Sequence, residues 1–259
     1  IDIKYEKSFK LTLFNPYVIR PKFNLEKSTY EDNSVYISKI LDPYTAVIAK
    51  WMYNLGFTAN TMTLVTFILG MSGIAIMYFE RSFLGFLIAA IFITLRNIGD
   101  TIDGKIARGT NTFSPLGGYS DIIADWLFFH AAFFIVLGII TGHPFLGFLC
   151  VTGYMSREFS RRKFTEKYGT KITDTKEAKK MSFVVSIIKK YDLASWFWII
   201  PILILIKPVF VIYFTVIVEY GLLFGELAIN YKILIKDNKM RWEKLEKGMI
   251  KGNNITKIS

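Results

Sequence analysis

Residues 100–125 read DTIDGKIARGTNTFSPLGGYSDIIAD, and two pairs of aspartates mark the ends of this stretch. Asp100 and Asp103 are three residues apart, and Asp121 and Asp125 are four apart. At these spacings each pair lies on one face of a helix. Residues 109–120 between the pairs are expected to form a loop that returns the chain, because glycine and proline mark turns and this segment contains Gly109, Pro115, Gly117 and Gly118. The stretch therefore predicts two helices joined by a turn, with four carboxylates facing one another.

Long apolar runs surround this stretch on both sides. The runs cover residues 61–79, 83–98, 122–141, 144–155 and 193–229. Several approach the roughly 20 residues that cross a bilayer. The last run is too long for one span, and Pro208 divides it because proline does not continue a regular helix. We therefore predict an all-α polytopic membrane protein, in which the aspartates lie at or inside helix ends.

Composition agrees with this class and excludes others. The 259 residues are 52% hydrophobic with a mean hydropathy of +0.35, which excludes a disordered chain. The single cysteine, Cys150, excludes an intramolecular disulfide and a cysteine-based zinc site. No cleavable signal peptide is expected, because the first residues are polar.

The basic residues predict the topology. Of the 32 Lys and Arg residues, eight fall in 1–57, eleven in 157–190 and eight in 232–259. Basic residues mark the cytoplasmic side of a membrane protein. Both termini and the 157–190 loop are therefore expected in the cytoplasm, which requires an even number of spans, and we predict six transmembrane helices in the cell (inner) membrane. Because the basic runs flank spans, nucleic acid is not an expected partner.

The N-terminal segment contains a pattern of its own. Apolar residues recur at helical spacing before the first span: Ile37, Leu41, Tyr44, Ile48, Trp51 and Leu55. We expect an interfacial amphipathic helix lying on the inner leaflet, or equally a helix that packs on the bundle. Asp42 and Pro43 suit the cap and first position of such a helix. The expected divisions are a cytoplasmic segment 1–57, a six-helix domain 58–230 and a cytoplasmic tail 231–259. Residues 232–251 of this tail are expected to extend the sixth helix.

Four converging carboxylates need a counter-charge. Ionised carboxylates in a partly desolvated cleft repel one another, so protons or cations must relieve the repulsion. Oxygen ligands favour Mg²⁺, Mn²⁺ or Ca²⁺ over zinc. Two divalent cations fit four carboxylates and leave coordination positions for phosphate oxygens, as phosphoryl transfer requires. Gly104 leaves the helix surface bare for a ligand, and Arg108 adds a cation suited to a phosphate.

The spacing D-x2-D-G-x2-A-R-x8-G-x3-D-x3-D resembles the signature of the CDP-alcohol phosphotransferase (phosphatidyltransferase) family at all eight fixed positions. The resemblance implies a phospholipid-synthesis enzyme that moves a substituted phosphate from a CDP-linked donor, such as CDP-diacylglycerol, to a hydroxyl acceptor and releases CMP. It implies Mg²⁺, with Mn²⁺ as the alternative, and a homodimer. The implied metal ligands are Asp100, Asp103, Asp121 and Asp125, with Asp125 also the general base. The implied CDP contacts are Gly104, Ala107, Arg108 and Gly117.

Two further segments resemble parts of this family. Residues 58–63, TANTMT, resemble its Pro-Asn-x-x-Thr segment with alanine at the proline position, which implies that Asn60 and Thr63 contact the CDP moiety. A helix cap is the alternative role for residues at this point. The run YMSRE at 154–158 resembles the part of inositol-phosphate-using members that binds the acceptor phosphate. Arg157 and Arg161 are the candidates, and arginine suits bidentate phosphate recognition.

A transporter or channel is the alternative to an enzyme. Intramembrane carboxylates also serve transporters and channels that move cations or protons. Such proteins place polar groups near the midplane of the bilayer. Here the aspartates cluster at one membrane face, which favours the enzyme. Stabilisation by CMP or a CDP-lipid would distinguish the two classes.

Overall fold

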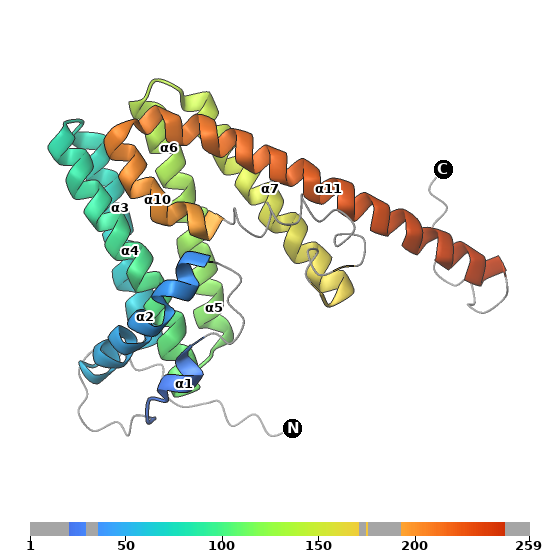
Figure 1. The fold of residues 1–259 in the computed structure, drawn as a ribbon, viewed down its shortest axis with the longest axis horizontal. Coiled ribbons are helices and arrows are strands. Elements are labelled where there is room, and N and C mark those ends of the chain that lie inside the picture. Colours follow the sequence, from blue (N-terminus) through green and yellow to red (C-terminus); the bar gives the residue numbers. More distant parts are fainter. Residues whose placement is uncertain (1–20, 30–35, 171–174, 176–192, 247–259) are drawn as a thin grey trace.

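The computed structural model describes residues 21–29, 36–170, 175 and 193–246, and every regular element in these residues is helical. This confirms the predicted all-α class. The helices, drawn in Figure 1, are α1 Leu25–Ser28, α2 Tyr36–Asn54, α3 Ala59–Phe79, α4 Phe83–Thr110, α5 Pro115–Ile122, the π-helix η1 Ile123–His130, α6 Ala131–Ile140, α7 Pro144–Tyr168, α10 Leu193–Ile206 and α11 Pro208–Glu246.

Short polar residues begin the helices that carry the aspartates. Thr58 caps α3 in a reciprocal arrangement with Thr61: the Thr58 hydroxyl accepts from the Thr61 N–H at 3.2 Å, and the Thr61 hydroxyl accepts from the Thr58 N–H at 2.7 Å. Ser82 caps α4, and Ser114 caps α5 with Pro115 in its first turn. Each cap satisfies N–H groups that have no partner inside the helix. Thr58 is therefore the cap of α3, and Asn60 does not serve as its cap.

Four helical stretches are long and apolar enough to cross a membrane among the residues described. They are Ala59–Phe79, Phe83–Thr110, Pro115–Ile140 and Pro208–Glu243. The protein is thus a membrane protein with transmembrane helices. The fourth and fifth predicted spans coincide with α7 and with the shorter α10. The total of six spans stays a prediction.

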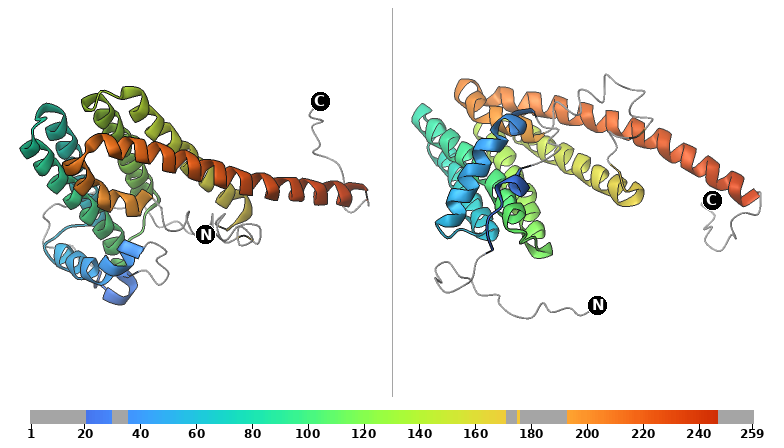
Figure 2. Two further views of the ribbon diagram at one scale, coloured as in Figure 1. Left: turned by 45° about the horizontal axis from the view of Figure 1, so that its top comes forward. Right: turned by 60° about the horizontal axis from the view of Figure 1, so that its bottom comes forward.

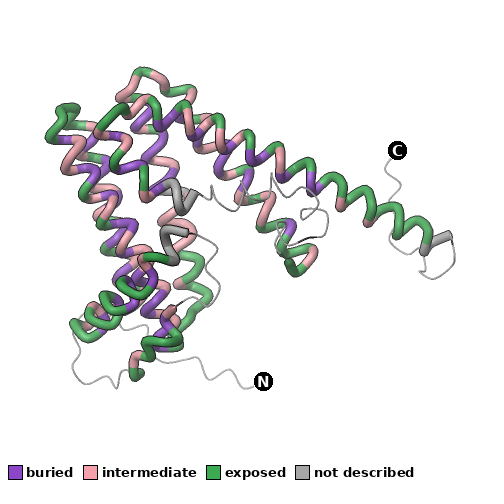
Figure 3. Tube along the Cα trace, in the orientation of Figure 1, coloured by how far each residue is buried: buried purple, intermediate pink, exposed green. Residues whose placement is uncertain are grey.

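An aromatic core joins the middle of the bundle. Phe129, Phe133 and Phe134 are fully buried, and each lies 5.8–6.0 Å from the ring of Phe197 on α10. Figure 3 shows buried residues along the inward sides of the bundle helices and exposed residues on the outward sides. In a bilayer the outward apolar residues face lipid, so the core is defined by packing and not by polarity.

Helices α7 and α11 run in parallel, side by side (Figures 1 and 2). Thr152 lies 3.0 Å from Tyr220, and Tyr168, four turns further along α7, bonds Asp237 at 3.3 Å. Helix α11 continues past the bundle as far as Glu246. This confirms, up to Glu246, that the tail extends the last helix, and the remainder of the tail lies outside the described residues.

The expected start of the N-terminal helix is wrong. Helix α2 begins at Tyr36, and Pro43 lies inside it instead of in its first turn. Asp42 does not serve as a cap, because its carboxylate pairs with Lys105 on α4.

The face of α2 on the bundle carries Thr45, Ala46 and Ala49, which are buried. The apolar residues Tyr44, Ile48, Trp51 and Leu55 of the predicted stripe, with Ile40 and Val47, are exposed, whereas the side chain of Ile37 lies outside those described.

Candidate active site

The aspartates come from consecutive helical elements that fold back on one another. Asp100 and Asp103 lie on α4, Asp121 on α5 and Asp125 on η1. Asn111 ends α4 in the left-handed conformation with φ 54°, a conformation that asparagine tolerates better than most residues. The chain then turns into the Ser114 cap of α5. The predicted helix–turn–helix is confirmed, but the expected loop 109–120 is too long, because α4 runs to Thr110 and the Ser114 cap starts α5 at Pro115. The second helix is interrupted by a π-helical segment of the kind often found at functional sites.

Three of the four carboxylates converge. Asp100, Asp103 and Asp121 each offer an oxygen, and these oxygens all lie within 4.8 Å of one another. Asp103 is oriented by the Thr63 hydroxyl, which donates to Oδ2 at 2.7 Å, and by the Gly104 N–H, which donates to Oδ1 at 2.5 Å. Asp121 Oδ1 is buried with no hydrogen-bond partner among the described residues. A buried carboxylate oxygen needs a partner, and three hard oxygen donors fit a cation such as Mg²⁺ or Mn²⁺.

The fourth carboxylate has a different partner. Asp125 Oδ1 accepts a hydrogen bond from the Arg96 guanidinium, which also donates to Asp100 Oδ1 at 3.2 Å. Arg96 is buried, at 4% exposed, whereas the Asp125 side chain is 20% exposed, so the guanidinium lies inside the bundle and the carboxylate at its edge. Asp125 is thus joined to the other three carboxylates through Arg96 and Asp100.

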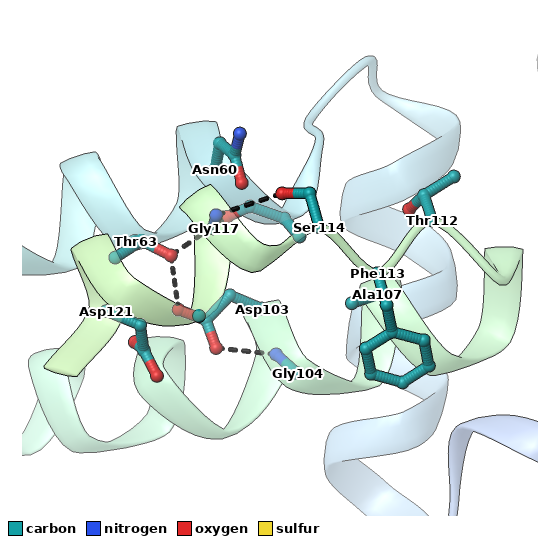
Figure 4. A pocket seen from close by; sticks show the side chains of 12 residues that line it. Asn60, Thr63, Asp103, Gly104, Ala107, Thr112, Phe113, Ser114, Gly117 and Asp121 are labelled. Carbon is teal, nitrogen blue, oxygen red and sulfur yellow. Dashed lines mark hydrogen bonds between the residues drawn. The ribbon is translucent and has the colours of Figure 1, made fainter. Parts of the chain in front are cut away.

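A cavity of about 170 Å³ opens beside Asp103 and Asp121 (Figure 4). Its walls come from the start of α3, the end of α4 and the turn into α5. The residues that line it include Asn60, Thr63, Asp103, Gly104, Ala107, Phe113, Ser114, Gly117 and Asp121. Five of the six predicted CDP contacts are therefore found around one cavity, next to two of the predicted metal ligands.

Gly117 allows two walls of this cavity to approach each other closely. A Cβ atom on Gly117 would lie 2.9 Å from Asn60 Oδ1 and 2.9 Å from Ser114 Oγ. The Gly117 N–H donates to Ser114 Oγ at 2.9 Å, which sets the first turn of α5. Glycine is therefore required for α5 to approach α3 this closely.

Arg108, the sixth predicted CDP contact, lies beside the cavity and not in its lining. Its side chain folds back over Gly104, where a Cβ atom would be 3.2 Å from Nη1. Its Nε donates to the Ser28 carbonyl of α1 at 3.3 Å. Gly104 thus makes room for the guanidinium of Arg108 as well as for a ligand.

The two predicted acceptor arginines lie between α7 and α11. Arg157 is fully buried, with Nη1 3.3 Å from Glu219 Oε2. Arg161 bonds Glu226 Oε1 through Nε at 2.9 Å and Nη2 at 2.7 Å. Both predicted positive groups are thus neutralised by glutamates of α11.

A comparison with protein-family models identifies this arrangement. The model of CDP-alcohol phosphatidyltransferase matches residues 57–221, more than half of the chain. The chain belongs to the CDP-alcohol phosphatidyltransferase family. This confirms the family that the eight-position signature indicated. No curated protein matches the chain.

Membership favours a transferase over a transporter or channel, and the matched region contains every aspartate of the site. As a member of the CDP-alcohol phosphatidyltransferase family, the protein presents three residues that the sequence did not single out for the site. Phe113 and Ser114 line the cavity, and Arg96 holds Asp125. The signal for Arg96 was present in the sequence, since it is the single charge in the apolar run 83–98 and lies four residues before Asp100.

Proposed function

We propose that this protein transfers a phosphatidyl-type group from a CDP-linked lipid, such as CDP-diacylglycerol, to a hydroxyl acceptor and releases CMP. One observation carries the proposal: three carboxylates from two helices, α4 and α5, converge at a cavity lined by residues of the family signature. Asp100, Asp103 and Asp121 would hold a divalent cation, and Asp125 would complete a second site. When bound, Mg²⁺ or Mn²⁺ would neutralise the pyrophosphate charge of the donor.

The residues of the chain supply the remaining steps. Asn60, Gly104, Ala107 and Gly117 would bind the CDP moiety in the cavity, and Arg108 would bind phosphate from its edge. Thr63 would contact the same moiety while its hydroxyl orients Asp103. The acceptor oxygen forms a bond to the phosphorus nearest the lipid while the bond from that phosphorus to the CMP oxygen breaks. The hydroxyl proton passes to Asp125 as general base.

The acceptor we propose is a phosphorylated polyol, such as inositol phosphate or glycerol phosphate. Arg157 and Arg161 would bind its phosphate, and an acceptor phosphate would then have to replace Glu219 and Glu226 as their partners. Support comes from the resemblance of the YMSRE segment and from the bidentate geometry that arginine offers to phosphate.

We also propose the topology and assembly. Six spans would place both termini and the aspartates on the cytoplasmic side of the cell (inner) membrane, in a homodimer. The exposed apolar side chains of α2, among them Trp51 and Val47, support an interfacial position for this helix. The proposed divisions are the N-terminal segment 1–57, the catalytic domain 58–230 and the tail 231–259.

A screen of acceptors tests this function. Purified protein in detergent is mixed with CDP-diacylglycerol or a CDP-linked ether lipid, Mg²⁺ and one acceptor at a time, and CMP release is measured. We expect release with a phosphorylated polyol and little release with the unphosphorylated polyol. Failure of every alcohol to release CMP, together with no stabilisation of the protein by CMP, would contradict the proposal.

A further inference from the structure

Arg96 occupies a defined position between two aspartates of the site. It lies on α4, one turn before Asp100, and its Nη2 donates to one oxygen of Asp100 and one of Asp125. Its Nη1 donates to Asn97 Oδ1 at 3.3 Å. A guanidinium is always charged and offers several donors in a fixed plane. One buried cation therefore links a helix that carries the metal-binding group to the helix that carries the proposed base.

The surroundings hold this guanidinium in place. Its Cζ lies 4.3 Å from the ring centroid of Phe129, which is fully buried one turn after Asp125. On the α3 side, a Cβ atom at Gly70 would lie 2.7 Å from Phe129 Cδ2 and 3.1 Å from Arg96 Cγ. The absence of a side chain at Gly70 thus leaves the space that the arginine and the ring share. A desolvated cation over an aromatic ring is favourable.

The four aspartates of the site do not form a single group. Asp100, Asp103 and Asp121 form one group of converging oxygens. Asp125 instead pairs with Arg96, which supplies positive charge where a second divalent cation would otherwise do so. We propose that Arg96 is a positioning residue that holds Asp125 in the site and that a second divalent cation reaches Asp125 only by displacing this guanidinium. The inference rests on the proposed function, because it requires cation binding at the aspartates.

The two cations of this enzyme should then bind with different affinities. The first binds the three-carboxylate group, in which Arg96 contacts one oxygen of Asp100 at 3.2 Å. The second must break the contact between Arg96 and Asp125 and approach a positive charge, which opposes binding because like charges repel strongly in a low dielectric. Changes in such outer partners typically alter metal affinity by about 10–100-fold. A purely structural ion pair would leave the difference between the two affinities unchanged.

Manganese binding tests this without any substrate. Mn²⁺ is titrated into the purified protein and free Mn²⁺ is followed by electron paramagnetic resonance. We expect one tight and one weaker Mn²⁺ in the unaltered protein. In Arg96→Gln the weaker site should tighten by about 10–100-fold, whereas Arg96→Lys, which keeps the charge, should stay close to the unaltered protein. Arg108→Gln removes one positive charge elsewhere in the site and should not narrow the difference between the two affinities.

Two more variants complete the test. The double variant Arg96→Gln/Asp125→Asn should bind a single Mn²⁺. This result would show that the site that tightens in Arg96→Gln includes Asp125. Should Arg96→Gln not fold, Phe129→Leu keeps every charge but removes the ring that holds the guanidinium, and it too should tighten the weaker site. Identical isotherms for the unaltered protein and each folded variant would overturn the role of Arg96 while leaving the proposed function intact. An unaltered protein that binds no Mn²⁺ would overturn both.

Discussion

Lys105 on α4 forms an ion pair with Asp42 on α2, and both side chains are buried. The Lys105 side chain is 0% exposed and that of Asp42 is 9% exposed. Lys105 follows Gly104 directly in the chain, so this pair attaches the N-terminal helix to the segment of α4 that forms the cavity wall. The N-terminal helix therefore contributes to the position of the site even though it contributes no residue to the aspartate group.

Separating this ion pair should destabilise the protein. Asp42→Leu leaves the Lys105 ammonium buried without its carboxylate partner, and such losses typically cost about 3–5 kcal/mol. We expect a clear fall in the thermal unfolding temperature in detergent. The double variant Asp42→Leu/Lys105→Met should recover most of the loss, because two apolar side chains leave no buried charge. A single variant as stable as the unaltered protein would show that Asp42 is not needed for this contact.

Asp125→Asn should abolish turnover without preventing donor binding. Asparagine keeps the shape of aspartate but cannot accept the acceptor proton, and losing a general base typically lowers the rate about 10²–10⁴-fold. CMP release reports the rate, and the thermal shift produced by CMP reports folding and binding. Asp237→Asn, on the projecting part of α11, is the matched control and should retain full activity. Full activity in folded Asp125→Asn would exclude the residue as the general base.

Removal of divalent cations should stop the reaction. The converging oxygens of Asp100, Asp103 and Asp121 leave three like charges together, and the donor adds a pyrophosphate. Excess EDTA should therefore abolish CMP release, and added Mg²⁺ or Mn²⁺ should restore it. The variant Asp121→Asn should require more metal for half-maximal activity. Undiminished activity in EDTA would contradict a cation at this group.

Gly117→Ala should weaken donor binding. The new methyl group would lie 2.9 Å from both Asn60 Oδ1 and Ser114 Oγ, so α5 must move away from α3 and widen the cavity. We expect the KM for the CDP donor to rise about tenfold, equivalent to about 1.4 kcal/mol. The neighbouring Gly118 has nothing within 4 Å of an added Cβ, so Gly118→Ala should have a much smaller effect. Equal effects of the two substitutions would argue against the close approach.

The topology can be tested with single cysteines in a Cys150→Ala background. Cysteines placed at His143 and Lys207, in the predicted outer turns, should react with a membrane-impermeant maleimide in intact cells. Cysteines placed at Lys10 and Lys257 should react only after the cells are permeabilised. Labelling of either terminus in intact cells would refute six spans with both ends in the cytoplasm.

Much of the fold was readable from local sequence. Runs of apolar residues, the caps at Thr58, Ser82 and Ser114, and the break at Pro208 all act within a few residues of the chain, so they define helices regardless of tertiary structure. The predicted start of the N-terminal helix was wrong because a proline usually lies in the first turn of a helix, whereas α2 continues through Pro43 and contacts α4. At this position packing outweighs the local preference of proline.

The candidate site, too, was predictable in part from the sequence and in part only from the tertiary structure. The sequence alone determined the apolar helices, the aspartate pairs on their faces and the family, because each depends on spacing along the chain. Tertiary structure alone decided that Arg96 pairs with Asp125, that Asn60 meets Gly117, and that Glu219 neutralises Arg157. Each of these contacts joins separate helices, so it depends on how the helices are rotated and how closely they pack, which no spacing within one helix specifies.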